Sequence, residues 1–371
     1  MSIKDPYLNL LALSACFNQN RVSSQPFINA CSQVNRWEII PTIAEEHGVA
    51  PLLYFQIRNL KINLSHEINQ ILKALALRHR LINRIHSQQI QEISTQMELA
   101  GIQAVFLKGA ALSHMLYSEP GLRPMSDIDL LVSRSDLQTA LGCITRLGYS
   151  GAEAGFDVDA SRHLPMLFKT IEGFDIHVEL HYALFQDKNA QPWFEIKDLC
   201  SPLQIFSIED ETPCTALGHE DMLFHLCQHA FYNNCGFDST RLIWVADIIN
   251  YAEAFYRQIN WNMVRLIYPS VIHTLQMLDD LVPFSSELKQ MIPLNKDHIP
   301  HQIEFEYKGW PTLPVAAWKS DGIRNLLFHS LFPSAWWLEL HYGRNKESPL
   351  WYYWGHHIHN LVWAFRDRMP K

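Results

Sequence analysis

The sequence predicts an α+β protein in which a small α/β core lies between two helical regions. Apolar residues recur every three or four positions through most of the first hundred residues, which is the spacing of amphipathic helices. Short apolar runs bounded by glycine turns follow, and the helical spacing then returns from about residue 217. We therefore predict a helical N-terminal region (1–100), an α/β core (101–205) and a helical C-terminal region (206–371) with an aromatic-rich end.

The composition of the 371-residue chain is typical of a globular protein, with 48% hydrophobic and 18% charged residues. The formal net charge of −8 argues against long nucleic acid as a partner, because such binding requires a basic surface. The seven cysteines include no Cys-x-x-Cys pair, which argues against a thiolate zinc site and a disulfide framework. No apolar run reaches the length of a membrane span and no signal-peptide pattern begins the chain, so we expect a cytoplasmic protein.

The two helical regions are predicted from long amphipathic segments. In the N-terminal region these are WEIIPTIAEEHGVAPLLYFQIRNL (37–60) and HEINQILKALALRHRLINRIHSQQIQEISTQMELAG (66–101). In the C-terminal region they are HEDMLFHLCQHAFYNN (219–234) and RLIWVADIINYAEAF (241–255). Tryptophan and tyrosine then cluster at 335–363, which favours a core or a subunit interface and leaves oligomerisation through this region open.

Five short segments make up the predicted core. IQAVFLKG (102–109) predicts a strand that ends in a glycine turn, and AALSHMLYSEPG (110–121) predicts a helix. DIDLLV (127–132) predicts a second strand, which is followed by a helix over SDLQTALGCITRLGY (135–149). The last segment, 166–184, predicts a hairpin that turns at Ile171-Glu172-Gly173.

The strand DIDLLV carries two acidic residues inside an apolar run. Side chains alternate between the two faces of a strand, so Asp127 and Asp129 should point the same way. Two carboxylates held side by side repel each other unless a cation lies between them. This pair therefore predicts a metal site.

The core segments LKGAAL (107–112), RPMSDIDLLV (123–132) and FDIHVELH (174–181) resemble the polymerase-β-type nucleotidyltransferase superfamily. Within it, the chain is similar to a bacterial family of uncharacterised nucleotidyltransferases with the pattern LKG…RPxxDIDLLV…DxH. HGVAPLL (47–53), LFHLCQHAF (223–231) and RLIWVADI (241–248) also fit, so the resemblance covers most of the chain. It implies a polymerase-β-like core, a small mixed sheet with helices, flanked by the two helical regions.

The implied reaction moves a nucleoside monophosphate from a nucleoside triphosphate to an acceptor and releases pyrophosphate. Positioning and charge neutralisation by divalent ions, here two Mg²⁺, supply most of the catalysis in such reactions. Asp127 and Asp129 would hold the ions together with a third carboxylate from the neighbouring strand. Asp175 is the candidate for this third ligand and for assisting deprotonation of the acceptor, with Glu179 on the same strand face as the alternative.

Four residues are candidates for binding the triphosphate of ATP or of another nucleotide. Lys108 and Gly109 lie at the strand-to-helix turn, where backbone N–H groups bind phosphate and glycine permits close approach. Arg123 could contact phosphate oxygens in a bidentate manner, and Ser126 could add a hydrogen bond. The superfamily usually has Gly-Ser at the turn where this chain has Gly109-Ala110, a departure for which Lys108 or Ser113 would have to compensate.

The sequence leaves several alternatives open. The acceptor is either a small molecule or a protein hydroxyl. The missing serine after Gly109 favours a nucleotide-binding module with little catalysis as a second function. A third is a metal-dependent phosphohydrolase that uses Asp175, His177 and His181. His225 and His229 have the spacing of a metalloprotease helix, but Leu226 stands where the catalytic Glu is needed, so an interhelical polar network is favoured there.

Overall fold

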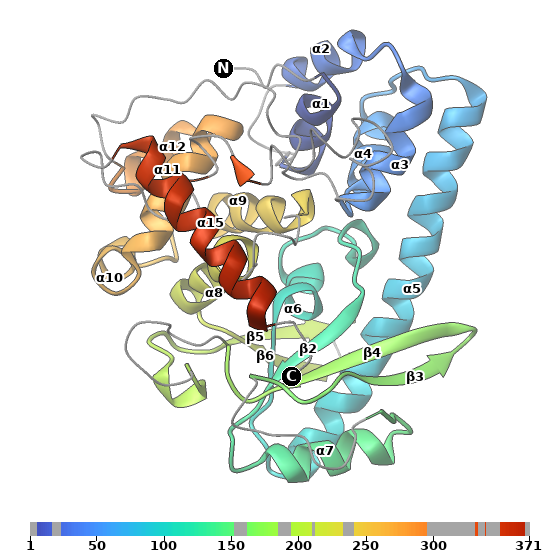
Figure 1. Ribbon diagram of the computed structural model, residues 1–371. Helices are drawn as coiled ribbons and strands as arrows, with labels where there is room; N and C mark the ends of the chain where they lie inside the picture. The colour runs from blue at the N-terminus through green and yellow to red at the C-terminus, as the bar shows by residue number, and fades with distance from the viewer. Residues whose placement is uncertain are drawn as a thin grey trace. The chain divides into compact units, whose positions relative to one another are not determined.

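The computed structural model describes most of the chain (Figure 1). The described residues are 6–16, 24–151, 162–184, 194–209, 212–232, 241–294 and 349–367, together with 331, 332 and 338. The chain divides into two compact units. One is Ser65–His225, and the other combines Met1–Leu64 with Leu226–Lys371.

The unit Ser65–His225 is built on a six-stranded mixed sheet with the order β3-β4-β2-β1-β6-β5. β2 and β4 pair in parallel, as do β1 and β6, whereas β1 with β2, β3 with β4 and β5 with β6 are antiparallel. The strands are β1 (Val105–Phe106), β2 (Asp127–Leu131), β3 (Leu167–Ile171), β4 (Phe174–His181), β5 (Gln204–Ile208) and β6 (Thr212–Ala216). The α+β prediction is thus confirmed.

Two helices of this unit, α5 (His66–Leu99) and α6 (Lys108–Met115), contact the sheet and the segment that precedes β2. The others are α7 (Leu137–Arg146), α8 (His219–Cys227, whose last two residues belong to the other unit) and the 3-10 turns η2 (Pro120–Leu122) and η3 (Ile196–Asp198). Ser65 begins α5 by accepting a hydrogen bond from the backbone N–H of Ile68. The 34-residue helix α5 then contacts η2, α6, α7, β2 and β6, so it connects the sheet with the helices beside it (Figure 1).

The paired strands β2 and β4 carry most of their apolar side chains on one face of the sheet. Ile128 and Leu130 of β2 are fully buried, as are Ile176, Val178 and Leu180 of β4. These residues alternate with the polar residues of the same strands, so one face of the sheet forms the hydrophobic core. The opposite face carries the carboxylates and histidines of the two strands, together with Leu131.

The other unit is helical wherever it is described. Its first part holds α1 (Pro6–Ala15), α2 (Gln25–Gln33), η1 (Trp37–Ile39), α3 (Ile40–Glu46) and α4 (Ala50–Asn59). Its second part holds the π-helical turn η4 (Gln228–Tyr232), α9 (Leu242–Phe255), α10 (Trp261–Ile267), α11 (Pro269–Leu281), α12 (Ser286–Met291) and α15 (Leu350–Asp367). The contacts of α1 with α2, α4 and α9 join the two parts. The helical regions predicted on both sides of the core are therefore present.

Two features of the organisation were not predicted. The hairpin β5–β6 extends the sheet beyond residue 205, and its strand β6 pairs with β1 in the middle of the sheet. Helix α5, assigned to the N-terminal region from the sequence, belongs to the same unit as the sheet. In the aromatic-rich end, most of 335–348 lies outside the described residues, whereas Trp351 and Tyr352 on α15 are exposed. Among the described residues, no helix is long and apolar enough to cross a membrane.

Candidate functional site

The parallel pairing of β2 and β4 brings the polar residues of the two strands together. Asp127 lies opposite His177, and Asp129 lies opposite Glu179. Because both pairs fall on the face away from the hydrophobic core, the two aspartates share a strand face as predicted. Asp127 is half-buried, and Asp129 is 2% exposed.

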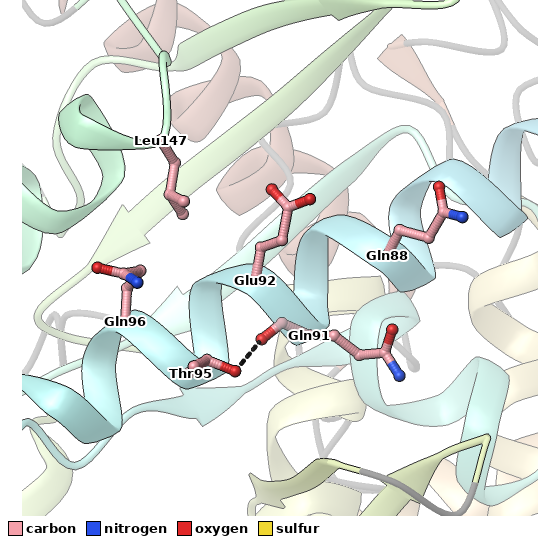
Figure 2. A pocket seen from close by; sticks show the side chains of 6 residues that line it. All are labelled: Gln88, Gln91, Glu92, Thr95, Gln96 and Leu147. Carbon is pink, nitrogen blue, oxygen red and sulfur yellow. Dashed lines mark hydrogen bonds between the residues drawn. The ribbon is translucent and has the colours of Figure 1, made fainter.

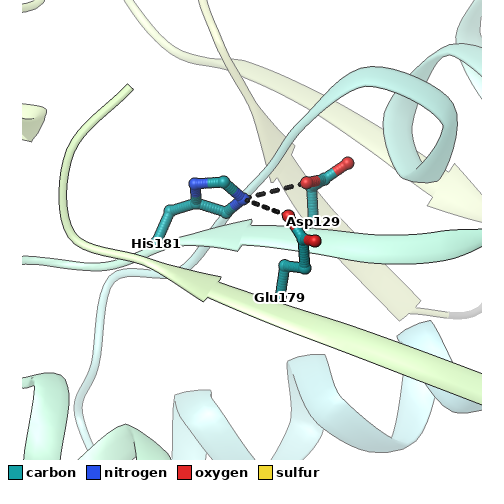
Figure 3. A group of neighbouring side chains, drawn as sticks. All are labelled: Asp129, Glu179 and His181. Atoms are coloured by element: carbon teal, nitrogen blue, oxygen red, sulfur yellow. Dashed lines mark hydrogen bonds and ion pairs between the residues drawn. The ribbon is translucent and has the colours of Figure 1, made fainter. Parts of the chain in front are cut away.

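Asp129, Glu179 and His181 form the centre of this face (Figure 3). The Nε2 atom of His181 lies 2.9 Å from Oδ1 of Asp129 and 3.4 Å from Oε2 of Glu179. One ligand atom of each of the three residues lies within 4.8 Å of the others, which is a spacing that suits a metal ion. His181 itself is 2% exposed, and the ring of His163 covers it at a centroid distance of 5.0 Å.

Lys108 adds a positive charge to this cluster. Its Nζ atom lies 2.9 Å from Oδ1 of Asp129, the same oxygen that His181 contacts. Lys108 is the first residue of α6 and has a φ of 44°, a left-handed conformation that costs free energy in a residue other than glycine. The backbone N–H of Leu107, which donates to the carbonyl of Asp129, ties this turn to β2.

The carboxylates of the site have different proton affinities. Burial would raise the pKa of Asp129, yet Lys108 and His181 together hold that pKa well below its usual range. Burial and the neighbouring charge of Asp129 raise the pKa of Asp127 to about 6. The hydrogen bond from His181 lowers the pKa of Glu179. The free site therefore concentrates its strongest negative charge on Asp129, against Lys108.

Arg123 and Gly109 lie against each other beside the aspartates. Arg123 is 7% exposed, and its Nη1 donates to the carbonyl of Pro124 at 2.9 Å. A Cβ atom on Gly109 would come within 2.3 Å of that Nη1, so only glycine allows the guanidinium to sit there. The space beside Gly109, where the sequence predicted the close approach of a phosphate, is thus filled by the guanidinium of Arg123.

The serines near the turn have specific partners. Ser126 donates from Oγ to Oδ1 of Asp127 at 3.2 Å. Ser113 is fully buried, and its Oγ points to the sulfur of Met125 at 3.7 Å. Ala110 is also buried. Of the two residues considered as substitutes for the missing hydroxyl, Lys108 reaches the cluster, whereas Ser113 contacts an apolar side chain.

A buried asparagine fixes the segment that leads into β2. The Nδ2 of Asn83 on α5 donates to the carbonyls of Pro120 and Arg123 at 2.6 and 2.7 Å. Its Oδ1 accepts from the backbone N–H of Met125 at 3.3 Å. Sequence reasoning missed this residue because asparagine in a long helix carries no signal of its distant partners.

Asp175 lies apart from the cluster. It sits near the start of β4, is exposed, and accepts a hydrogen bond from Oγ1 of Thr170 at 2.6 Å. Its neighbour on the strand face, His177, is opposite Asp127, and Glu179 is one pair further along. The geometry therefore favours Glu179 over Asp175 as the third carboxylate.

The remaining histidines singled out from the sequence occupy different surroundings. His225 is buried, and burial lowers its pKa well below the usual value, with the charges of Lys108 and Asp129 also acting on it. His225 thus stands in the electrostatic field of the cluster. His229 falls in the π-helical turn η4, where its ring packs on Trp244 with centroids 4.6 Å apart.

A hollow of about 550 Å³ lies elsewhere on the sheet unit, between α5 and the end of α7 (Figure 2). It is open and lined by Gln88, Gln91, Glu92, Thr95, Gln96 and Leu147. Thr95 uses its Oγ1 to bond the carbonyl of Gln91 within the helix, at 2.9 Å. This lining offers one carboxylate among neutral side chains, whereas the Asp127–Asp129 face brings together three carboxylates.

The donor set of that face fits a hard divalent cation. Carboxylate oxygens are the ligands that Mg²⁺ and Mn²⁺ prefer. Asp127, Asp129 and Glu179 supply them from two adjacent strands, and Oδ1 of Asp129 already contacts the ammonium group of Lys108. Asp127 and Asp129 with Glu179 are the residues that could hold the metal.

Comparison with known proteins gave one match. A family model described as "Uncharacterised nucleotidyltransferase" matches residues 33–267, which include the whole sheet and the Asp127–Asp129 face. Neither the search of curated proteins nor that of solved structures found a match.

Proposed function

Because the chain belongs to the uncharacterised nucleotidyltransferase family, we propose that it transfers a nucleoside monophosphate from a nucleoside triphosphate to a hydroxyl group of a small molecule or a protein. In this reaction the acceptor oxygen forms a bond to the α-phosphorus. The bond from that phosphorus to the bridging oxygen breaks, pyrophosphate leaves, and the hydroxyl proton is lost. The mixed sheet with its helices is consistent with this family assignment.

The observation that carries the proposal is the face shared by Asp127, Asp129 and Glu179. Three carboxylates on two paired strands, with Asp129 buried, form an arrangement that repels itself unless cations are bound. When bound there, Mg²⁺ would neutralise phosphate charge and promote loss of the acceptor proton. We propose Glu179 as the third ligand, and Asp175, the candidate from the sequence, is the residue against which this choice is tested.

The basic residues of the site are proposed to bind the triphosphate. Lys108 provides an ammonium group at the start of α6, where backbone N–H groups also favour anions. Arg123 provides a guanidinium held beside Gly109, and that geometry suits bidentate contact with phosphate oxygens. Ser126 orients Asp127 through its hydrogen bond.

A second candidate function is nucleotide binding without efficient transfer. It is favoured by Ala110, which stands where the superfamily usually has serine and is buried, so it offers no hydroxyl to a phosphate. A phosphohydrolase centred on Asp175 and His177 receives less support, because Asp175 is bonded to Thr170 away from His181.

The proposal is tested by titrating ATP, GTP, CTP and UTP into the wild type and into Asp127→Asn by calorimetry, with and without Mg²⁺. The substitution removes ligand charge at nearly constant volume, so the variant should keep its fold and lose metal-dependent binding. Pyrophosphate release is then measured with small-molecule and protein acceptors. Binding that persists unchanged in Asp127→Asn would contradict the proposed site, and binding without pyrophosphate release would favour the second candidate.

A further inference from the structure

One oxygen atom, Oδ1 of Asp129, lies within hydrogen-bond distance of two side-chain nitrogens. Nζ of Lys108 and Nε2 of His181 each lie 2.9 Å from it. This is the buried carboxylate of the proposed metal site, so a metal ion and Lys108 compete for the same negative charge. A carboxylate that is already neutralised attracts a cation less strongly.

The side chains of Lys108 and His181 differ in how easily they can move away from Asp129. His181 is 2% exposed, contacts Glu179 as well as Asp129, and lies under the ring of His163. Lys108 is 12% exposed and carries its charge on a flexible four-carbon stem. Its hydrogen bond to Asp129 is made from the turn at the start of α6, where a bound triphosphate would lie. Lys108 is therefore the group that can move.

We propose that Lys108 is an exchangeable counter-ion, which holds Asp129 in the ligand-free protein and transfers its ammonium group to a phosphate oxygen when metal and triphosphate bind together. This inference rests on the proposed function and deepens it. It assigns Lys108 a role that couples the two ligands, beyond simple attraction of phosphate. Metal alone must displace the ammonium without giving it a new partner, so metal and nucleotide bind cooperatively, each increasing the affinity for the other.

The exchange predicts that removal of the lysine charge changes the affinities for metal and for nucleotide in opposite directions. Without the ammonium group, less positive charge offsets the repulsion among the three carboxylates of Asp127, Asp129 and Glu179. Metal binding in the absence of nucleotide therefore becomes stronger. Nucleotide binding in the presence of metal becomes weaker, because the phosphate loses its ammonium partner. A lysine with a merely structural role would weaken both.

The test uses Lys108→Gln, which removes the charge but keeps an unbranched side chain able to donate a hydrogen bond to Asp129. Mn²⁺ is titrated into the nucleotide-free protein and followed by electron paramagnetic resonance. We expect Mn²⁺ affinity to rise about tenfold and the affinity for a non-hydrolysable ATP analogue with Mn²⁺ to fall about tenfold, relative to the wild type. The matched control is Lys169→Gln on β3, whose Nζ bonds Gln89 at 3.3 Å, and which should leave both affinities unchanged.

Weaker Mn²⁺ binding by Lys108→Gln would overturn the exchange and leave the proposed function standing. Absence of both Mn²⁺ and nucleotide binding in the wild type would overturn the proposed function as well. If Lys108→Gln does not fold, wild-type lysines are labelled as ¹³C-dimethylamines and the Lys108 signal is assigned with Lys108→Arg. The signal should shift when metal and analogue are added together, and an unchanged signal would contradict the proposal.

Discussion

The two acidic residues of β4, Asp175 and Glu179, have different neighbours. Glu179 pairs with Asp129 and contacts His181, whereas Asp175 is exposed and bonded to Thr170. The sequence places both acids on one strand face and offers no means of choosing between them. The choice depends on the strand register, which places Glu179, and not Asp175 four residues earlier on β4, opposite the buried Asp129.

Glu179→Gln is expected to lower the rate of transfer on the order of 100-fold or more and to weaken Mn²⁺ binding, because it removes one ligand charge. Asp175→Asn keeps an oxygen that can accept from Thr170 and should change either quantity less than about threefold. Pyrophosphate release and Mn²⁺ titration on the two variants provide the comparison. The reverse ranking would restore Asp175 as the third ligand.

Gly109→Ala tests the contact between the turn and Arg123. The added methyl group would lie 2.3 Å from Nη1 of Arg123, so the guanidinium must move away. We expect nucleotide affinity to fall about tenfold in calorimetric titrations.

The matched control for that variant is Gly142→Ala, inside α7. There a methyl group meets only Nη1 of Arg146, at 3.6 Å, so the helix should gain about 0.5–1 kcal/mol of stability while binding stays unchanged. If Gly109→Ala bound nucleotide normally, the position of Arg123 beside this turn would not matter for the ligand.

At the scale of elements, helix α5 positions the site without contributing a ligand. Asn83 bonds three backbone groups of the segment before β2, and that segment carries Arg123. Asn83→Ala leaves those buried groups unsatisfied, and we expect a loss of roughly 3 kcal/mol in the free energy of unfolding with weaker nucleotide binding. Denaturant titration measures the first effect and calorimetry the second.

Gln88 offers the control on the same helix, because it is exposed at the hollow of Figure 2. Gln88→Ala should change stability by less than about 0.5 kcal/mol. Asn83→Asp separates the two roles of the amide, since a carboxylate accepts from Met125 but cannot donate to the two carbonyls. Stability equal to the wild type in Asn83→Asp would show that those donated bonds are dispensable.

The elements with strong local signals were predicted, and those defined by distant pairing were not. The segment DIDLLV and the hairpin of β3 and β4 follow from apolar runs and a glycine turn. The strands β5 and β6 were assigned to a helical region, although Phe206 and Ile208 are buried while Ile205, just before them, is 75% exposed. That alternation is a strand signal, but it spans too few residues to stand out beside long helices.

For the candidate site, the sequence predicted the shared strand face of Asp127 and Asp129 but not the contacts that surround it. Asp127 and Asp129 are adjacent in sequence, so the period of a strand suffices to place them together. The contact of Lys108 with Asp129, and the cover that His163 gives His181, join residues that are distant in sequence. Such contacts depend on register and on how a turn is oriented, which a single sequence does not encode in any local pattern.

At the scale of the whole molecule, histidines with lowered pKa values link stability to pH. Burial lowers the pKa of His47 to about 3 and those of His86 and His114 to about 4. His47 lies in one unit, and the other two lie in the unit with the sheet. In the unfolded chain each would titrate near 6.5, so the unfolded state binds more protons than the native state between about pH 4 and 6.5.

The protein is therefore expected to be most stable above about pH 6.5 and to lose stability as the pH falls towards 4. At pH 5 each histidine contributes a loss of up to roughly 2 kcal/mol, whereas Asp127, with its pKa raised to about 6, opposes the trend as a single group. The histidines outweigh this one carboxylate, so the urea midpoint should be lower at pH 5 than at pH 7. Replacing His86 by Gln removes one titrating group and should reduce proton uptake on unfolding by nearly one between these pH values. A midpoint that does not change from pH 7 to pH 5 would mean that these rings are accessible to protons in the folded protein.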